Sequence, residues 1–205
     1  MDKINNKIYY IVGSCGFAAH KFHPSQGDTV IAADGGYASV GSRANYAVGD
    51  WDSLGGKPQD IACVSLPTRK DLTDMGYAIQ LALRGGADEI RLFGADGGRI
   101  DHYLANLQYA VYIAGMGVRC TIYCADCNIY ACHIGTATIK GRKGATMSFI
   151  PMQENTCVSL SGVEYPLDNH TMPYDNPGLG VSTVIAKDIA DITVHSGAGL
   201  IILYD

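Results

Sequence analysis

The sequence predicts an α/β N-terminal domain with a mostly parallel sheet, followed by a C-terminal all-β sandwich domain. Two observations carry this prediction. As far as residue 127, short apolar runs rich in β-branched residues alternate with segments whose apolar residues recur at helical spacing. From residue 128 onward the helical spacing disappears, and short runs are separated by Gly, Asn, Asp and Pro. We therefore expect two domains, at residues 1–127 and 128–205.

In the first domain, apolar runs predict buried strands and helical spacing predicts helices between them. The expected strands are at residues 8–12, 29–33, 89–93 and 118–123. Apolar residues share one helical face over 72–83 and again over 104–114. Alternation of strand and helix indicates a parallel sheet covered by helices.

In the second domain, every predicted element is a short strand. The expected strands are at residues 136–140, 145–150, 156–160, 181–186, 191–195 and 200–204. Turn residues separate these runs, and this texture is typical of an all-β sandwich or barrel.

Composition excludes several classes of protein. The 205 residues are 47% hydrophobic and 17% charged, as in a folded soluble protein, and the net charge is −5 without a basic stripe. We therefore expect neither nucleic acid nor an anionic membrane as a partner. The N-terminus is too polar for a secretory signal, so we expect a cytoplasmic protein. Seven cysteines argue against a disulfide framework, and the group Cys120, Cys124, Cys127 and Cys132 lacks the second close pair of a zinc site.

Carboxylates follow two of the apolar segments. Asp34 and Gly35 come directly after the strand at 29–33, where an α/β sheet binds its ligands, although an ordinary Asp-Gly turn has the same sequence. Asp50 and Asp52 are two residues apart, so in an extended stretch they point to the same side. Two such carboxylates repel each other unless a cation lies between them, and Mg²⁺ prefers oxygen ligands of this kind. The alternative is a surface turn closed by Asx hydrogen bonds.

Two further segments precede the predicted helices. In the first, Asp71 or Thr73 can cap the helix, and Asp74 lies in its first turn. In the second, Gly98 lets a phosphate approach the backbone at a helix N-terminus, and Arg99 can bind that phosphate through two parallel hydrogen bonds. Together with the other carboxylates, these residues indicate Mg²⁺–nucleotide chemistry. No Walker A motif and no G-x-G-x-x-G fingerprint occurs in the sequence.

Taken in order, these segments resemble the thiamine pyrophosphokinase (thiamin diphosphokinase) family. The residues that carry the resemblance are ADGG (33–36), VGDWDS (48–53), KDLTD (70–74), GGRIDHYLAN (97–106), GVEYPLDN (162–169) and GVST (180–183). They run through nearly the whole chain, and the second and fourth are specific. The resemblance implies a homodimer that has an ATP- and Mg²⁺-binding α/β domain and a β-sandwich for thiamine binding and dimerisation.

The resemblance also implies roles for individual residues. The Mg²⁺ ligands would be Asp50, Asp52 and Asp74, which with Arg99 and Asp101 form the expected catalytic set. The site of the co-substrate ATP would comprise Asp34, Gly35, Lys70, Thr73, Gly98, Arg99 and His102. Tyr165 and Ser182 would contact thiamine from the partner chain. The family commonly has Ser-Asn where this chain has Ser182-Thr183.

The implied reaction transfers pyrophosphate from ATP to the hydroxyethyl oxygen of thiamine, giving thiamine diphosphate and AMP. Either Asp74 or Asp101 could accept the proton of the alcohol. Two other functions stay open. A related pyrophosphokinase could act on another hydroxyalkyl heterocycle, such as a pterin, and a catalytically silent sensor could bind the nucleotide or thiamine without turnover.

Overall fold

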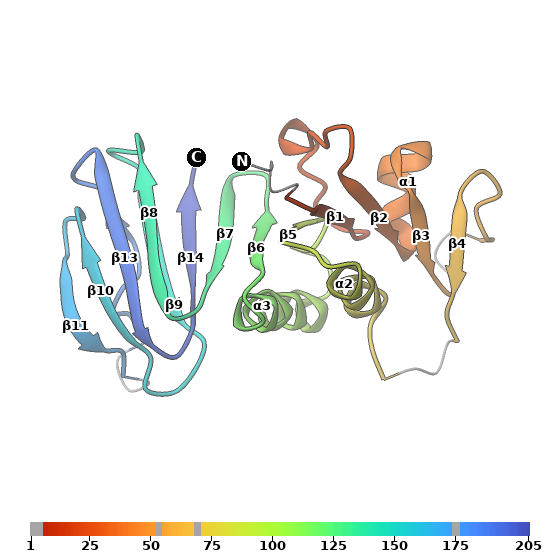
Figure 1. Ribbon diagram of the computed structural model, residues 1–205. Helices are drawn as coiled ribbons and strands as arrows, with labels where there is room; N and C mark the ends of the chain where they lie inside the picture. The colour runs from red at the N-terminus through yellow and green to blue at the C-terminus, as the bar shows by residue number, and fades with distance from the viewer. Residues whose placement is uncertain (1–5, 52–54, 68–70, 174–176) are drawn as a thin grey trace, which may run out of the picture. The chain divides into compact units, whose positions relative to one another are not determined.

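The structure is a computed structural model that describes residues 6–51, 55–67, 71–173 and 177–205 (Figure 1). The chain forms two compact units. The first contains the described residues as far as Tyr109 together with Thr121–Ala125, and the second contains Ala110–Cys120 and Asp126–Asp205. Within the described ranges, no helix is both long and apolar enough to span a bilayer.

The first unit is built on a sheet whose strands were predicted in part. Their order is β6-β5-β1-β2-β3-β4. The strands are β1 (Ile8–Val12), β2 (Thr29–Ala33), β3 (Tyr46–Gly49), β4 (Ala62–Ser65), β5 (Glu89–Phe93) and β6 (Arg119–Tyr123). Strand β1 pairs in parallel with both β2 and β5, and β2–β3 and β3–β4 are also parallel. The carboxyl ends of these strands therefore meet at one edge of the sheet.

Helices and short 3₁₀ turns connect the strands. They are η1 (Ala19–Lys21), η2 (Asp34–Gly36), α1 (Tyr37–Val40), η3 (Gly41–Arg43), α2 (Asp74–Arg84) and α3 (Ile100–Gly115). Helix α2 begins where expected because the Thr73 hydroxyl caps it, accepting a hydrogen bond from Gly76 N at 3.0 Å. Its buried face includes Met75, Ile79 and Ala82, so it packs on the sheet as its apolar spacing predicts.

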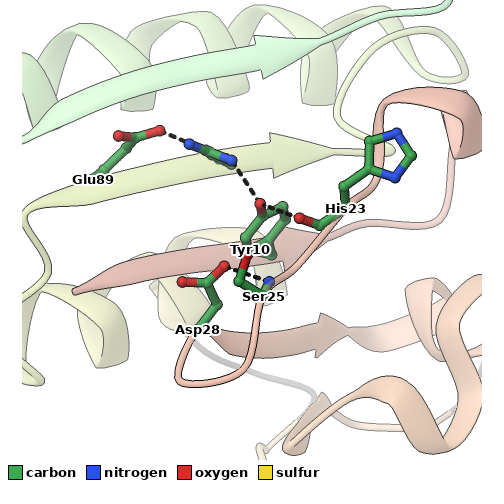
Figure 2. Close-up of polar contacts among 6 residues, drawn as sticks. Tyr10, His23, Ser25, Asp28 and Glu89 are labelled. Atoms are coloured by element: carbon green, nitrogen blue, oxygen red, sulfur yellow. Dashed lines mark hydrogen bonds and ion pairs between the residues drawn. The ribbon is translucent and has the colours of Figure 1, made fainter. Parts of the chain in front are cut away.

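The β1–β2 connection covers the sheet on the side opposite α2 (Figure 1). Phe22 of this connection packs edge-on against Tyr10 and Phe93, and all three belong to one buried cluster. The Tyr10 hydroxyl donates a hydrogen bond to the His23 carbonyl at 3.0 Å and accepts one from Arg91 Nη1 at 2.6 Å (Figure 2). These contacts attach the connection to β1 and β5.

The second unit consists of two facing antiparallel sheets. Their orders are β12-β9-β14-β7 and β11-β10-β13-β8. The strands are β7 (Cys127–Cys132), β8 (Gly135–Lys140), β9 (Thr146–Pro151), β10 (Cys157–Ser161), β11 (Leu167–Thr171), β12 (Thr183–Val184), β13 (Ile189–Ser196) and β14 (Gly199–Tyr204). Phe149 and Ile201 from one sheet share a buried cluster with Leu160 and Ile192 from the other. Alternating side chains of both sheets thus form one core.

The predicted division into a unit with helices on a sheet and a second, all-β unit is confirmed, and in the first unit the parallel pairs β5–β1, β1–β2, β2–β3 and β3–β4 agree with the predicted mostly parallel sheet. Four strands were not predicted, namely β3, β4, β7 and β11. The first two have only four residues each, and β11 (Leu-Asp-Asn-His-Thr) is an exposed edge strand that lacks apolar alternation. The run at 181–186 forms only the two-residue strand β12. All seven cysteines are described, and none forms a disulfide.

Candidate functional site

The strand order creates a switch point between β1 and β5. Strands β2, β3 and β4 follow one another on one side of β1 within the sheet, and β5 then pairs with the other side of β1. In open α/β sheets, ligands bind in the crevice outside the carboxyl ends of the strands at such a point. Gly13 follows β1 and Gly94 follows β5, and a Cβ on Gly13 would lie only 2.5 Å from Gly94 O. Glycine at both positions allows the two strand ends to come together there.

A cavity of about 500 Å³ opens at this edge of the first unit. Four predicted segments contribute to its wall, together with the ends of β1 and β5. The lining residues are Gly13, Ser14, Cys15, Ala33, Asp34, Asp50, Thr73, Asp74, Met75, Gly94, Ala95, Gly97, Gly98, Arg99, His102 and Asn106. Residues that are far apart in the sequence therefore surround one space large enough for a small ligand.

Three carboxylates belong to this wall. Asp34 and Asp50 follow the neighbouring strands β2 and β3, and Asp74 lies in the first turn of α2. The backbones of the first two run close together, because a Cβ on Gly49 would lie 3.1 Å from Asp34 Cα. Asp34 has a left-handed backbone (φ 46°), and its Oδ1 is buried. Asp52, predicted as their partner, lies outside the described residues.

The donor chemistry of this wall fits Mg²⁺. Carboxylate oxygens of Asp50 and Asp74, with the Thr73 hydroxyl beside them, are hard ligands of the type that Mg²⁺ prefers. The described residues, which leave out Asp52, contain no group of three or more His, Cys, Asp or Glu side chains arranged to hold a metal ion. This is compatible with Mg²⁺, which usually binds through one or two carboxylates and completes its shell with water and phosphate oxygens.

Another part of the wall carries a cationic side chain. Gly97 and Gly98 have left-handed backbones (φ 76° and 63°) and lead into the N-terminus of α3. Arg99 lines the cavity and donates from Nε and Nη2 to the two carboxylate oxygens of Asp101, at 3.1 and 2.6 Å. A helix N-terminus, flexible glycines and a guanidinium form an anion-binding arrangement.

Asp101 is not part of the cavity wall. Its hydrogen bonds with the Arg99 guanidinium lower the pKa of the carboxyl group to about 2. The same pair raises the pKa of Arg99. Asp101 is therefore ionised at neutral pH, and it forms an ion pair with Arg99 in which both side chains are exposed.

The sequence motifs identified some of the lining residues and missed others. Asp34, Asp50, Thr73, Asp74, Gly98, Arg99 and His102 line the cavity as expected. Gly35 does not line it, and Lys70 lies outside the described residues. The segment Gly13–Cys15 was missed, although its place after a predicted strand was a usable signal. Asn106, which is buried, holds the Ala95 carbonyl through a 2.7 Å hydrogen bond from Nδ2.

The two predicted thiamine contacts lie in the second unit, on neighbouring segments. Tyr165 is 69% exposed, and its backbone N–H donates to Thr183 Oγ1 at 3.2 Å. Ser182 has a left-handed backbone (φ 58°), and its N–H donates to Ser148 Oγ at 3.0 Å. Thr183 is buried, and its hydroxyl oxygen holds the Tyr165 backbone through this hydrogen bond.

Comparison with known proteins covers both units. Residues 23–122 match the family model of the thiamin pyrophosphokinase catalytic domain, and residues 134–201 match that of its vitamin B1 binding domain. The thiamine pyrophosphokinase of Bacillus subtilis (strain 168) is 30% identical over 149 residues, or 69% of this chain and 67% of that protein. The chain belongs to the thiamin pyrophosphokinase family. Members of this family are enzymes.

Solved structures share the fold over nearly the full chain. The thiamine pyrophosphokinase of Bacillus subtilis has a TM-score of 0.84 at 23% identity, covering 97% of this chain and 98% of its own. The Geobacillus thermodenitrificans thiamin pyrophosphokinase has a TM-score of 0.81 at 25% identity, with 97% of both chains covered. The Candida albicans enzyme has 0.75 at 14% identity and covers 98% and 91%. The fold is thus retained in relatives that share few residues with this chain.

Proposed function

We propose that this thiamin pyrophosphokinase family member transfers pyrophosphate from ATP to the hydroxyethyl oxygen of thiamine, releasing AMP. One observation carries the proposal: carboxylates, a hydroxyl, glycines and an arginine from four separate motifs line a single cavity at the switch point of the sheet. A Mg²⁺–nucleotide site needs both acidic and basic groups around one space. Family membership indicates the acceptor, because the second unit matches a vitamin B1 binding domain.

In this reaction the thiamine oxygen attacks the β-phosphorus of ATP, and the bond from that phosphorus to the AMP oxygen breaks. The alcohol proton passes to a carboxylate or to water as the new bond forms, and AMP departs as the leaving group. Phosphoryl transfer asks little covalent chemistry of a protein, so positioning and charge stabilisation supply most of the catalysis. Asp50, Asp74 and Asp52 would hold Mg²⁺, which when bound neutralises the charge of the phosphate oxygens.

The remaining residues of the first unit would bind and orient the nucleotide. We assign Asp34, Gly35, Thr73, Gly98 and His102 to the phosphate-binding surface, with Lys70 completing it. Arg99 would offset negative charge on the leaving phosphate. Asp101 would pair with Arg99, and the pKa of about 2 that this pairing gives its carboxyl group makes it a weak base for the alcohol proton.

We further propose that residues 128–205 supply the acceptor site and the dimer contact, while residues 1–127 supply the ATP site. Tyr165 and Ser182 would contact thiamine bound to the partner subunit of a homodimer. The exposed Tyr165 ring suits this role, because covering a large, water-exposed aromatic face with a heterocycle is energetically favourable. Hydrogen bonds from the Tyr165 and Ser182 backbone N–H groups to the hydroxyls of Thr183 and Ser148 would hold the two residues in position for this contact.

A product assay tests the proposal. Purified protein is incubated with Mg²⁺, ATP and thiamine, and AMP and thiamine diphosphate are quantified against a control without thiamine. Equal amounts of both products, dependent on thiamine, are expected. Product formation only with another hydroxyalkyl heterocycle, such as a hydroxymethylpterin, would contradict the acceptor. Binding of ATP or thiamine without any turnover would instead identify a sensor.

A further inference from the structure

We propose that Trp51 is a positioning residue for Asp50, and that a hydrogen bond from its indole to Ser65 holds this carboxylate at the cavity. The proposal rests on the proposed function, in which Asp50 holds Mg²⁺. Asp50 and Trp51 directly follow β3, and Ser65 is the last residue of β4. The two strand ends are neighbours, because Gly49 and Ser65 are paired in register. Neither Trp51 nor Ser65 lines the cavity.

The backbone of Trp51 is left-handed, with φ at 68°. The other non-glycine residues with positive φ in the described part of the chain are Asp34, Asn155, Asn169 and Ser182. Asp and Asn tolerate this conformation because their short side chains bond to the local backbone, whereas a bulky aromatic residue adopts it only when its surroundings impose it. Strain of this kind concentrates at functional sites.

Two features of the surroundings hold Trp51. The indole is 9% exposed and belongs to the buried cluster that also contains Ala47 of β3. Its Nε1 donates a hydrogen bond to Ser65 Oγ at 3.1 Å. Beside it, Leu66 N donates to Gly49 O at 3.0 Å, which closes the β3 and β4 ends together. The ring is therefore packed on its faces and oriented by its one polar atom.

This arrangement separates two adjacent side chains. Trp51 goes into the core, while Asp50, one residue earlier, lines the cavity. If the indole loses its hydrogen bond, the left-handed backbone loses part of its support and can relax to a more common conformation. The carboxylate of Asp50 would then spend only a fraction of the time at the cavity, and the apparent metal affinity falls by that fraction.

Three variants of the full-length protein test this mechanism: Ser65→Ala, Trp51→Phe and the double variant. Ser65 is exposed, so its replacement leaves the core intact. Tyr10→Phe is the control, because it removes two side-chain hydrogen bonds from the same buried cluster without touching Asp50 (Figure 2). The readouts are the Mn²⁺ dissociation constant in the presence of ATP, measured by electron paramagnetic resonance, and the unfolding midpoint.

We expect Ser65→Ala and Trp51→Phe each to weaken Mn²⁺ binding by about three- to tenfold, as loss of one neutral hydrogen bond allows. The double variant should be no weaker than the single ones, since both remove the same contact. Tyr10→Phe should lower the unfolding midpoint and leave Mn²⁺ affinity unchanged. Unchanged Mn²⁺ affinity in Ser65→Ala, or equal losses in Tyr10→Phe, would overturn the proposal.

Trp51 is the only tryptophan in the chain, so its fluorescence gives a second readout. Adding Mn²⁺ and ATP to the wild type should quench the indole emission, and Trp51→Phe provides the blank. A wild type that forms thiamine diphosphate without this response would refute the role of Trp51 and leave the proposed function intact. An indole response in a wild type that forms no product with any acceptor would support the role of Trp51 and contradict the proposed function.

Discussion

The two units place their polar groups in different ways. In the first, the residues of the cavity wall lie just past the ends of parallel strands and at the starts of helices. In the second, Tyr165 and Ser182 lie on connections beside the two-residue strand β12, held by backbone hydrogen bonds. A parallel sheet gathers its loops at one edge, whereas an antiparallel sandwich distributes them between both ends. The first unit is therefore suited to holding several charges around one ligand, and the second to presenting a few contacts.

The largest effect is expected when a charge is removed from the cavity wall, at the sheet edge where the loops of the first unit meet. Asp50→Asn should lower kcat by at least about a hundredfold at saturating Mg²⁺, because a neutral amide is a poor ligand for a hard cation. Thiamine binding and the unfolding midpoint should change little. Steady-state kinetics and calorimetry measure these quantities.

The matched control for this variant is Asp88→Asn. Asp88 precedes β5, at the opposite edge of the same sheet, where its carboxylate accepts a hydrogen bond from Lys7 N at 2.9 Å. Turnover of this control should remain close to that of the wild type. Wild-type turnover of Asp50→Asn itself would remove the metal assignment.

The next largest effect is expected at Arg99, a cationic residue of the cavity wall. Arg99→Gln should lower kcat by about ten- to a hundredfold, since in the proposed reaction the lost cation stabilises charge that develops during transfer. Arg99→Lys keeps the charge and loses the two parallel donors, so we expect an intermediate value. Equal activity of the lysine variant and the wild type would show that charge alone is needed there.

The second unit should respond in a different kinetic constant. Ser182→Ala and Tyr165→Ala are each expected to raise KM for thiamine by about tenfold, because each removes one of the proposed contacts to the acceptor. KM for ATP should stay the same. Tyr204→Ala, an exposed aromatic at the end of β14, is the control. A rise in KM for ATP in the Ser182 or Tyr165 variant would contradict the division of roles between the units.

A smaller effect concerns stability. Thr73→Ala removes the cap of α2 and should lower the free energy of unfolding by about 1 kcal/mol, whereas Thr73→Ser retains the hydroxyl and should not. Chemical denaturation of the unliganded protein measures the difference. Equal losses in both variants would show that the threonine methyl group, and not the cap, stabilises this end of the helix.

The smallest expected effect is on pH dependence. The pKa of Asp101 is lowered to about 2, so its ion pair with Arg99 is complete at neutral pH and is lost only as pH falls through that value. The acidic limb of the kcat/KM profile above about pH 3 therefore belongs to another group. In Asp101→Asn the midpoint of that limb should not move. A shifted midpoint would return Asp101 to the role of proton acceptor.

The difference between the two units also explains which strands could be predicted from the sequence. Strands β1, β2 and β5 are buried apolar runs, so both their positions and the polar residues at their ends could be predicted. Strand β11 could not, because an edge strand with exposed Asp168, Asn169 and His170 has the composition of a loop.

In the site, the motif residues were predictable, and the contribution of Gly13–Cys15 was less visible. That segment enters the cavity only because β5 adds to the far side of β1, and strand order is not encoded in local spacing. The Arg99–Asp101 pair was also hidden. Both residues stood in a motif that suggested two separate ligands, and only their geometry shows that they pair with each other.

The position of β5 also determines when the site can exist. Tyr10 of β1 and Arg91 of β5 are in contact although they are 81 positions apart in the sequence. Closing so long a loop is slow and entropically costly, so this pairing forms late relative to local helices and turns. Before it forms, the Gly13 and Gly94 ends are apart and the wall is incomplete. If ATP binds as proposed, it should therefore stabilise the finished sheet and slow its unfolding. The early steps of folding, and the first ninety or so residues emerging from the ribosome, should proceed without help from the nucleotide.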